Sequence, residues 1–320
     1  MRIPELTLEQ LQAYQPKQTR RRDFEEFWKN TMEEALSEPL EAEFLPMSYP
    51  VEAVRVFDVS FAGSQNTRIY GTYITAASPN TKGPGLAVFH GYGWHAMRVV
   101  HTLSWVMAGF SVLSLEVRGQ DPRSPDRASY PNGHAAGWMT QGITKKESYY
   151  YRHVYTDCVR AVQLLAEREE VDPEKIAVTG MSQGGGLSLA TAALHPRVSL
   201  CMPDLPFLCH FERAVQLAES GPYQEIARYL KTYDPPGHHR HELFATLSYF
   251  DCMNLAPWIS CPLFVSVGLE DSTCPPSTVF AAFNHALSAD RSMKIYPQWG
   301  HDEIPWHEEE KLAYALKVFS

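Results

Sequence analysis

Short apolar segments alternate along most of the chain with longer segments whose apolar residues recur at helical spacing. The short segments are rich in β-branched residues and too short for buried helices, so they predict strands. Strands that are apolar on both faces are typical of a mostly parallel sheet covered by helices on both sides, and we therefore expect an α/β architecture. The strands predicted in this way span residues 85–90, 110–115, 176–179, 200–203, 263–268 and 292–296.

Three regions depart from this alternation. Residues 54–59 and 67–74 alternate apolar and polar positions on either side of a turn, which predicts an antiparallel pair leading into the larger sheet. Residues 1–45 show helical spacing and a capping threonine, Thr7, and predict an N-terminal helical extension. Residues 207–250 are helical and aromatic, and we interpret them as an insertion lying over the carboxyl edge of the sheet.

The composition is that of an ordinary globular protein, with 44% hydrophobic and 20% charged residues. The chain has no internal repeat, and we expect one α/β domain over residues 1–320 that includes the extension and the insertion. The formal net charge of −9 argues against a nucleic-acid or anionic-membrane partner. Residues 1–6 lack the basic and apolar blocks of a signal peptide, and no segment is long enough to span a membrane, so we expect a cytoplasmic protein.

The cysteines and histidines do not predict a metal site. The six cysteines include no Cys-x-x-Cys pair, and in a cytoplasmic chain we expect them to be reduced and buried. The stretch His238-His239-Arg240-His241 follows Pro235-Pro236-Gly237, which favours a solvated loop. We therefore predict no metal and no other cofactor.

The strongest functional signal is the pentapeptide Gly180-Met181-Ser182-Gln183-Gly184. It follows the predicted strand at 176–179 and opens a predicted helix that ends before His195-Pro196. A serine between two glycines at such a junction lies on a sharp turn, with its hydroxyl at the carboxyl edge of the sheet and near the positive end of a helix. In this context the motif predicts the nucleophile elbow of an α/β-hydrolase, although a glycine-rich turn with an incidental serine would look the same.

A serine nucleophile needs a base to accept its proton and a carboxylate to orient that base. In this fold the acid and then the histidine follow the serine along the chain. The loop after the next-to-last strand supplies Asp271, with Glu270 as a rival, and either carboxylate would otherwise only cap the following helix. His301, in a glycine-containing loop after the last strand, is the predicted base, whereas we assign His285 to helix packing and His307 to a helix surface.

An ester hydrolase also needs two donors directed at the developing oxyanion. One is the backbone N–H of Gln183, the residue after the nucleophile. The other is expected from the loop His90-Gly91-Tyr92-Gly93, where we choose the N–H of Tyr92, although this loop could also be a simple turn.

Arg118 and Gln120 follow the predicted strand at 110–115, at the same carboxyl edge. Direct contact with substrate is one role for them. A structural role fits better, because a guanidinium with five fixed donors can tie neighbouring loops together behind the catalytic histidine.

Together these residues resemble the acetyl xylan esterase and cephalosporin C deacetylase family, carbohydrate esterase family seven, over nearly the whole chain. The triplet Arg118-Gly119-Gln120 and the run Ser182-Gln183-Gly184-Gly185-Gly186 are the most specific motifs. The resemblance also rests on residues 21–24, 27–28, 89–92, 117–120, 133–140, 149–152, 211–214, 247–251 and 274–282.

The resemblance implies an α/β-hydrolase that removes acetyl groups from acetylated xylo-oligosaccharides and from cephalosporin C. By position it implies Ser182 as nucleophile, Asp271 as acid and His301 as base. It also implies that the amides of Tyr92 and Gln183 form the oxyanion hole. Finally, it implies a homohexamer, a trimer of dimers with active sites facing a central cavity, which would suit an intracellular enzyme acting on small imported substrates.

Several positions differ from the usual family pattern. Asp302 follows the predicted base where glutamate is common, Met181 replaces a usual glycine at the elbow, and Asp121 replaces a common glycine after the Arg-Gly-Gln triplet. The loop at residues 93–97 also differs. These positions border the predicted site, so we expect them to affect substrate preference more than chemistry.

Three other functions are compatible with the same motifs. An esterase of this fold could act on another small acyl substrate. The elbow and triad also serve peptidases of the prolyl-oligopeptidase type, which would cleave peptide p-nitroanilides. A protein that binds a ligand without turnover would not react with a serine-directed fluorophosphonate.

Overall fold

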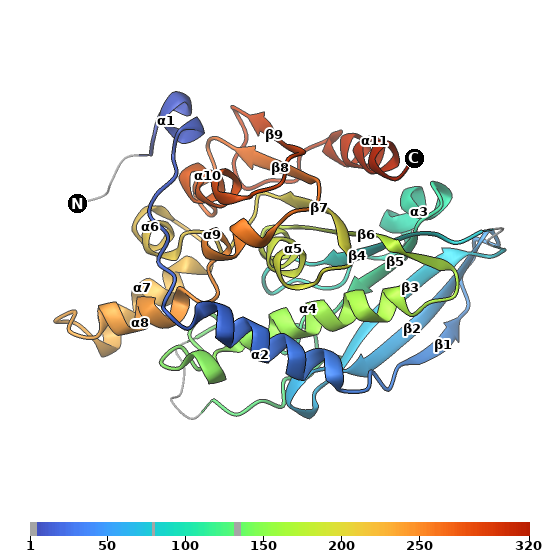
Figure 1. The fold of residues 1–320 in the computed structure, drawn as a ribbon, viewed down its shortest axis with the longest axis horizontal. Helices are drawn as coiled ribbons and strands as arrows, with labels where there is room; N and C mark the ends of the chain where they lie inside the picture. The colour runs from blue at the N-terminus through green and yellow to red at the C-terminus, as the bar shows by residue number, and fades with distance from the viewer. Residues whose placement is uncertain (1–4, 79–80, 131–135) are drawn as a thin grey trace.

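A nine-stranded sheet runs through the protein in the order β1-β2-β3-β5-β4-β6-β7-β8-β9 (Figure 1). The computed structural model describes residues 5–78, 81–130 and 136–320. The first three strands and the pair β3 and β5 are antiparallel, whereas every pair from β5 to β9 is parallel. The six strands predicted from apolar segments are confirmed as β4 to β9. The strands are β1 (Glu43–Met47), β2 (Val54–Ala62), β3 (Arg68–Ala76), β4 (Gly83–Phe89), β5 (Ser111–Leu115), β6 (Val171–Met181), β7 (Val198–Asp204), β8 (Leu263–Gly268) and β9 (Arg291–Tyr296).

The N-terminal region is only partly the helical extension predicted for residues 1–45. Residues 1–4 lie outside the described ranges, α1 (Leu8–Gln12) begins after a capping box formed by Thr7, and α2 (Phe24–Ser37) follows. Strand β1, however, already begins at Glu43 and pairs with β2. The prediction missed this edge strand because Phe44 is its one partly buried side chain, and a single packed residue gives no clear alternation.

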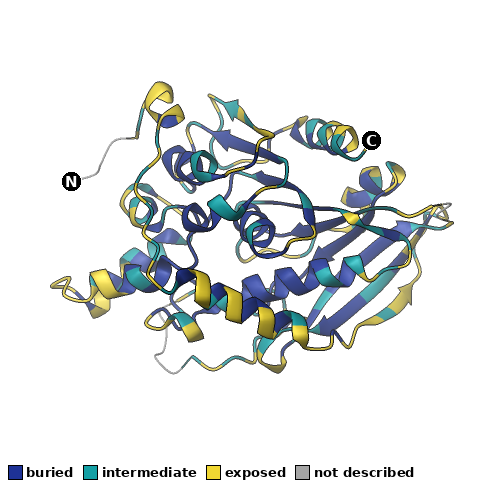
Figure 2. Cartoon of the chain, viewed as in Figure 1, coloured by how far each residue is buried: buried dark blue, intermediate teal, exposed yellow. Residues whose placement is uncertain are grey.

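Helices cover both faces of the sheet (Figure 1). Neighbouring strand residues point to opposite faces, so Leu113 of β5 packs in the larger core with Trp28, whereas Val112 packs in the smaller core with Trp105. Figure 2 shows that the inner strands and the helices against them are mostly buried, and that exposed residues gather at the outer faces of the helices. The larger core lies under α2, α4 (Tyr150–Ala166), α5 (Gln183–Leu194), α9 (Cys252–Leu255) and α10 (Pro276–His285), and the smaller core under α3 (Val99–Met107) and α11 (His307–Phe319).

Residues 207–250, predicted as a helical insertion, form three helices after the carboxyl end of β7. These are α6 (Phe211–Leu217), α7 (Tyr223–Tyr233) and α8 (Arg240–Leu247). The N-terminal helix α2 packs against the end of this segment, because Trp28 Nε1 donates a 2.8 Å hydrogen bond to Tyr249 O and the ring of Phe24 stacks on that of Tyr249. The extension and the insertion are therefore joined to each other.

The six cysteines are unpaired, and all except the half-buried Cys261 are buried, so the prediction of burial is correct for five of them. No helix in the described ranges combines the length and the apolar character needed to cross a bilayer.

Candidate active site

Ser182 lies on a sharp turn between the end of β6 and the start of α5. Its φ of 59° and ψ of −116° form a strained conformation for a residue with a side chain. The close approach of β4 requires glycine on both sides, because a Cβ would lie 2.2 Å from Phe89 O at Gly180 and 1.9 Å from it at Gly184. The Ser182 N–H donates to Asp204 O at 2.9 Å, which ties the turn to β7. The chain thus forms the turn that a nucleophile elbow requires.

Asp271 and His301 meet at the carboxyl ends of β8 and β9. The Nδ1 of His301 lies 2.7 Å from Asp271 Oδ2, which leaves the Nε2 of the ring directed away from the carboxylate. Asp271 Oδ1 accepts hydrogen bonds from the N–H groups of Thr273 (2.8 Å) and Cys274 (2.7 Å), so the buried carboxylate is held at both oxygens. The rival carboxylate, Glu270, is exposed. The structure therefore brings Asp271 rather than Glu270 to the histidine.

Cys274 is the residue at this site that the sequence reasoning missed. Its fully buried Sγ lies within 4.8 Å of a ring nitrogen of His301 and a carboxylate oxygen of Asp271. Burial raises the pKa of this thiol well above its usual value, and the Asp271 carboxylate raises it further, so the thiol is neutral near pH 7. The feature of the sequence that could have indicated Cys274 as a site residue is its position three residues after Asp271, in the same loop.

Asp271, Cys274 and His301 also form, within the described ranges, the one group of three possible metal ligands, with ligand atoms within 4.8 Å of one another. Zinc is bound by this combination of carboxylate, thiolate and imidazole in proteins. Here the carboxylate and the imidazole are already hydrogen-bonded to each other, and a metal ion would have to displace that bond. The exposed histidines at 238, 239 and 241 belong to no such group in the same ranges.

Gln183 is the first residue of α5, so its backbone N–H is one of the helix's free N-terminal donors. Its buried side chain accepts hydrogen bonds from Gln120 Nε2 (2.8 Å) and the Tyr151 hydroxyl (2.9 Å), and donates to Gln120 Oε1 (2.9 Å). The same Gln120 oxygen accepts the Gly93 N–H at 2.9 Å. Gln120 thus links the residue after the nucleophile to the loop of the second predicted donor, Tyr92. Gln120 therefore has a structural role beside the site.

His90 connects the ends of β4 and β5. The Val117 N–H donates to its Nε2 at 2.9 Å, so Nδ1 carries the hydrogen and donates it to Gly91 O at 2.7 Å. Burial lowers the pKa of His90 to about 4. A neutral imidazole therefore fixes the start of the Tyr92 loop.

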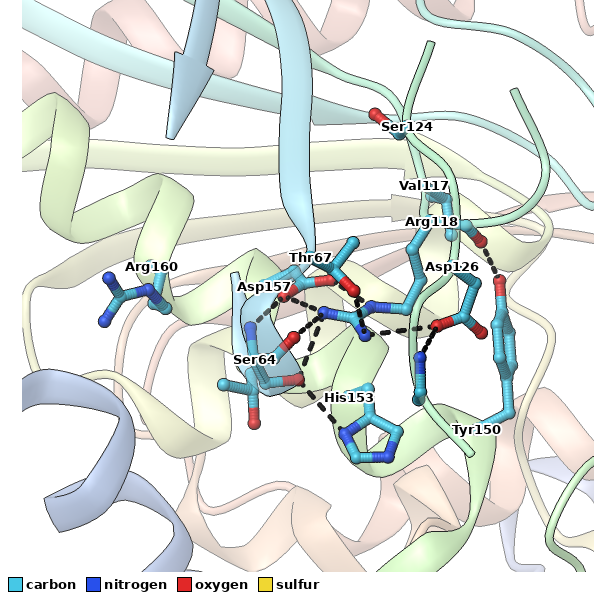
Figure 3. Close-up of polar contacts among 12 residues, drawn as sticks. Ser64, Thr67, Val117, Arg118, Ser124, Asp126, Tyr150, His153, Asp157 and Arg160 are labelled. Carbon is cyan, nitrogen blue, oxygen red and sulfur yellow. Dashed lines mark hydrogen bonds and ion pairs between the residues drawn. The ribbon is translucent and has the colours of Figure 1, made fainter. Parts of the chain in front are cut away.

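Arg118 is fully buried, and its guanidinium is surrounded by polar groups from several segments (Figure 3). Its guanidinium donates to both oxygens of Asp157 on α4, at 2.6 and 2.8 Å, and reaches Asp126 at 3.4 Å and Ser64 O at 2.9 Å. These contacts give Arg118 a structural role. Its partners are Asp157 on α4, Asp126, and Ser64 in the turn after β2. We expected Arg118 to tie loops together behind His301, and these partners lie elsewhere.

The assignment of His307 to a helix surface is wrong. Its side chain is buried at the start of α11, where Nε2 lies 2.7 Å from Asp204 Oδ1, and Lys311 Nζ lies 2.6 Å from Oδ2 of the same carboxylate. Burial by itself would raise the pKa of Asp204, but Lys311 and His307 hold it below its usual value. The sequence pattern does not indicate that a half-buried carboxylate at the end of β7 faces this helix. His285, assigned to helix packing, is half-buried at the end of α10.

The chain matches the acetyl xylan esterase family over residues 1–318. It belongs to this family. Of the stretches on which the resemblance rested, residues 133–135 lie outside the described ranges.

Two solved acetyl xylan esterases are very similar to the chain over its whole length. The enzyme from Paenibacillus sp. R4 is 41% identical, with a TM-score of 0.95 and coverage of 98% of this chain and 100% of that one. Acetyl xylan esterase 1 from Thermoanaerobacterium sp. JW/SL YS485 is 34% identical, with a TM-score of 0.94 and coverage of 99% and 100%. The acetyl esterase Axe7A of Xylanibacter ruminicola is 29% identical over 285 residues, which are 86% of this chain, and the chain spans 62% of that protein's length. The likeness to the two solved structures shows the α/β-hydrolase fold.

The positions that depart from the family pattern all lie near the sheet's carboxyl edge. Met181 is half-buried at the elbow, Asp302 is exposed beside His301, and Asp121 accepts the Arg123 N–H at 3.0 Å. In the loop at residues 93–97 the Trp94 side chain is 64% exposed. Their effect on substrate preference stays a prediction.

Proposed function

We propose that this protein is a serine esterase that removes acetyl groups from acetylated xylo-oligosaccharides and from cephalosporin C. The observation that carries the proposal is the 2.7 Å contact between Asp271 and His301, at the same sheet edge as the strained turn of Ser182. Membership of the acetyl xylan esterase family supports acetyl esters as the substrate class.

The reaction follows two acyl transfers. His301 takes the Ser182 proton as Oγ attacks the acetyl carbonyl, and the backbone N–H groups of Tyr92 and Gln183 donate to the developing oxyanion. Asp271 orients the imidazole through Nδ1 and stabilises the imidazolium that forms. The sugar alcohol leaves with the proton from His301. Water activated by the same base then attacks the acyl-enzyme and releases acetate.

The proposal includes a cytoplasmic homohexamer, a trimer of dimers. The family resemblance supports this assembly, and the six unpaired cysteines agree with a reducing compartment. Light scattering on the purified protein tests the assembly. A particle mass near the 36.2 kDa of one chain would contradict it.

Acetate release from acetylated xylo-oligosaccharides and from cephalosporin C tests the substrate and the nucleophile together, with wild type and Ser182→Ala measured side by side. We expect release by the wild type and almost none by the variant, because binding and the oxyanion donors alone give little turnover. Equal rates on acetyl and butyryl esters would count against a deacetylase with a small acyl pocket. If wild type released no acetate but Ser182 reacted with a fluorophosphonate, the triad would stand and the substrate would be another ester.

A further inference from the structure

Glu225, on helix α7 of the insertion, contacts the loop that carries one of the two proposed oxyanion donors. The Tyr92 hydroxyl donates to the Glu225 carboxylate and lies 2.8 Å from each of its oxygens. The Trp138 N–H donates to this hydroxyl at 2.6 Å, and the Met139 N–H donates to Glu225 Oε2 at 3.0 Å. Hydrogen bonds to an ionised carboxylate are stronger than neutral ones. Three segments distant in sequence are therefore joined at one carboxylate.

The surroundings of this carboxylate are closely fitted to it. A Cβ on Gly137 would lie 2.0 to 2.1 Å from the carboxylate atoms of Glu225, and Gly137 has a φ of 96°, which favours glycine. The rings of Tyr92 and Trp138 also pack edge-to-face, with centroids 5.1 Å apart. The Tyr92 side chain is thus held both by its hydroxyl and by its ring.

The first turn of α7 is connected in turn to the nucleophile. Helix α7 begins at Tyr223, two residues before Glu225, and the ring of Tyr223 lies 4.1 Å from that of Phe207 between centroids. The Phe207 N–H donates to Ser182 O at 2.9 Å. A continuous series of contacts therefore leads from the elbow through α7 to Tyr92.

We propose that Glu225 is a positioning residue for the oxyanion hole. By holding the Tyr92 side chain, it keeps the N–H of Tyr92 at the distance from the N–H of Gln183 that a tetrahedral intermediate needs. His90 holds the start of the same loop and Gln120 holds it through the Gly93 N–H, whereas Glu225 is the acceptor for the Tyr92 hydroxyl. This inference rests on the proposed function, since it takes these two amides as the donors. The insertion then contributes to catalysis without touching the reacting atoms.

The test compares Glu225→Gln, Tyr92→Phe and the double variant with wild type. The measurements are kcat and KM on an aryl acetate, and the inhibition constant of a trifluoromethyl ketone, whose adduct with serine places an oxyanion in the hole. Glutamine keeps the size of the side chain, but its NH₂ cannot accept the N–H of Met139 and a neutral oxygen is a weaker acceptor for Tyr92.

Misplacing one oxyanion donor should lower kcat about ten- to hundredfold and leave KM within about twofold. The affinity for the ketone should fall in parallel with kcat/KM. The kcat of the double variant should be no lower than that of the less active single variant, because both changes act through the same contact.

Glu212→Gln is the matched control, because Glu212 is an exposed carboxylate in the first turn of α6 in the same insertion, and its kcat should equal that of wild type. Rates are expressed per site titrated with a fluorophosphonate, which removes the effect of misfolded protein. A lower melting temperature with unchanged kcat per site and unchanged ketone affinity would show a merely structural role and overturn the inference.

Ser182→Ala separates the two proposals: if it keeps the wild-type rate, the proposed function fails. If it is inactive while Glu225→Gln equals wild type, the inference alone fails.

Discussion

The two halves of the candidate site are built in different ways. The first comes from two loops that follow neighbouring parallel strands, β8 and β9, and its carboxylate is held by amides two and three residues further along the chain. The second draws on segments up to 133 positions apart and is joined by hydrogen bonds between partly buried side chains. We call them the acid–base half (Asp271, Cys274 and His301) and the oxyanion half (Tyr92, Gln120, Gln183 and Glu225).

This difference has a consequence for mutations. A change in the acid–base half should lower the rate with little effect on folding, since its hydrogen bonds join residues of two adjacent loops. A change in the oxyanion half should lower stability as well, because it breaks hydrogen bonds between segments distant in sequence. The same holds for the fully buried Arg118, because its loss leaves a buried carboxylate without its partner. Four experiments can confirm or break this contrast.

The largest effect is expected from Asp271→Asn. The amide can still accept a backbone N–H, but it no longer holds His301 in the correct tautomer or stabilises the imidazolium, so kcat should fall about 10⁴-fold. The melting temperature should change little. The control is the exposed neighbour, Glu270→Gln, which should keep its rate within about twofold. Inactivation by the control instead of by Asp271→Asn would show that the acid was wrongly assigned.

Arg118→Met tests the support of the oxyanion half. The Arg118 carbonyl accepts the Tyr150 hydroxyl, which in turn accepts Gln120 Nε2 at 3.1 Å. Removing the guanidinium leaves the buried Asp157 without its ion pair, and the free energy of unfolding in urea should fall by about 3–5 kcal/mol. Arg197→Met, which removes a surface ion pair with Glu174, should cost at most about 1 kcal/mol. Equal losses in the two variants would contradict the buried network.

The pH dependence of stability gives a third test, through His90. Its pKa is lowered from 6.5 to about 4 by burial, so between these values the unfolded chain binds a proton that the folded one does not. The free energy of unfolding should therefore fall as the pH decreases from 6.5 to 4, by at most about 3 kcal/mol for this residue. His153 and His195, whose pKa values are lowered to about 3 and about 4, act in the same direction.

To test this, the free energy of unfolding is measured as a function of pH for wild type and His90→Gln, and the two slopes are compared. Loss of His90 should make the slope between pH 6.5 and 4 shallower, whatever the variant's absolute stability. An unchanged slope would mean that His90 is not the neutral buried group that its hydrogen bonds indicate.

The smallest effect is expected from Cys274→Ser. A serine hydroxyl is a stronger hydrogen-bonding group than a thiol and at this position lies near His301, where it competes with Ser182 for the imidazole, so kcat should fall, by less than about tenfold. Cys274→Ala removes the thiol without adding a competing hydroxyl and should keep the wild-type rate or exceed it. The control is Cys261→Ser, at a half-buried cysteine just before β8. Pre-steady-state acylation rates measure the difference, and a large loss in Cys274→Ala would show that the thiol has a more direct role.

The positions of Asp271 and His301 in the acid–base half were predictable from the sequence. Ser182 and Asp271 follow β6 and β8, whose buried residues are visible as short apolar runs, and His301 lies in the loop after the partly exposed edge strand β9. The carboxyl ends of parallel strands meet at one edge, so strand order and loop position were enough to place the three residues at that edge. The thiol of Cys274 was not predicted, because a buried cysteine and a site cysteine look alike in a sequence.

The sequence by itself determined the α/β architecture, strands β2 to β9, the elbow at Ser182 and the loops that carry Asp271 and His301. Hydrophobic period and local turn chemistry control these features, and both are properties of neighbouring residues. The tertiary structure alone decided that Glu43–Met47 forms an edge strand, that His307 is buried on Asp204 and that Glu225 meets Tyr92. The physical reason is that a polar group is stable inside a protein only with a partner. That partner is supplied by distant segments once the chain has folded, so no local pattern indicates it.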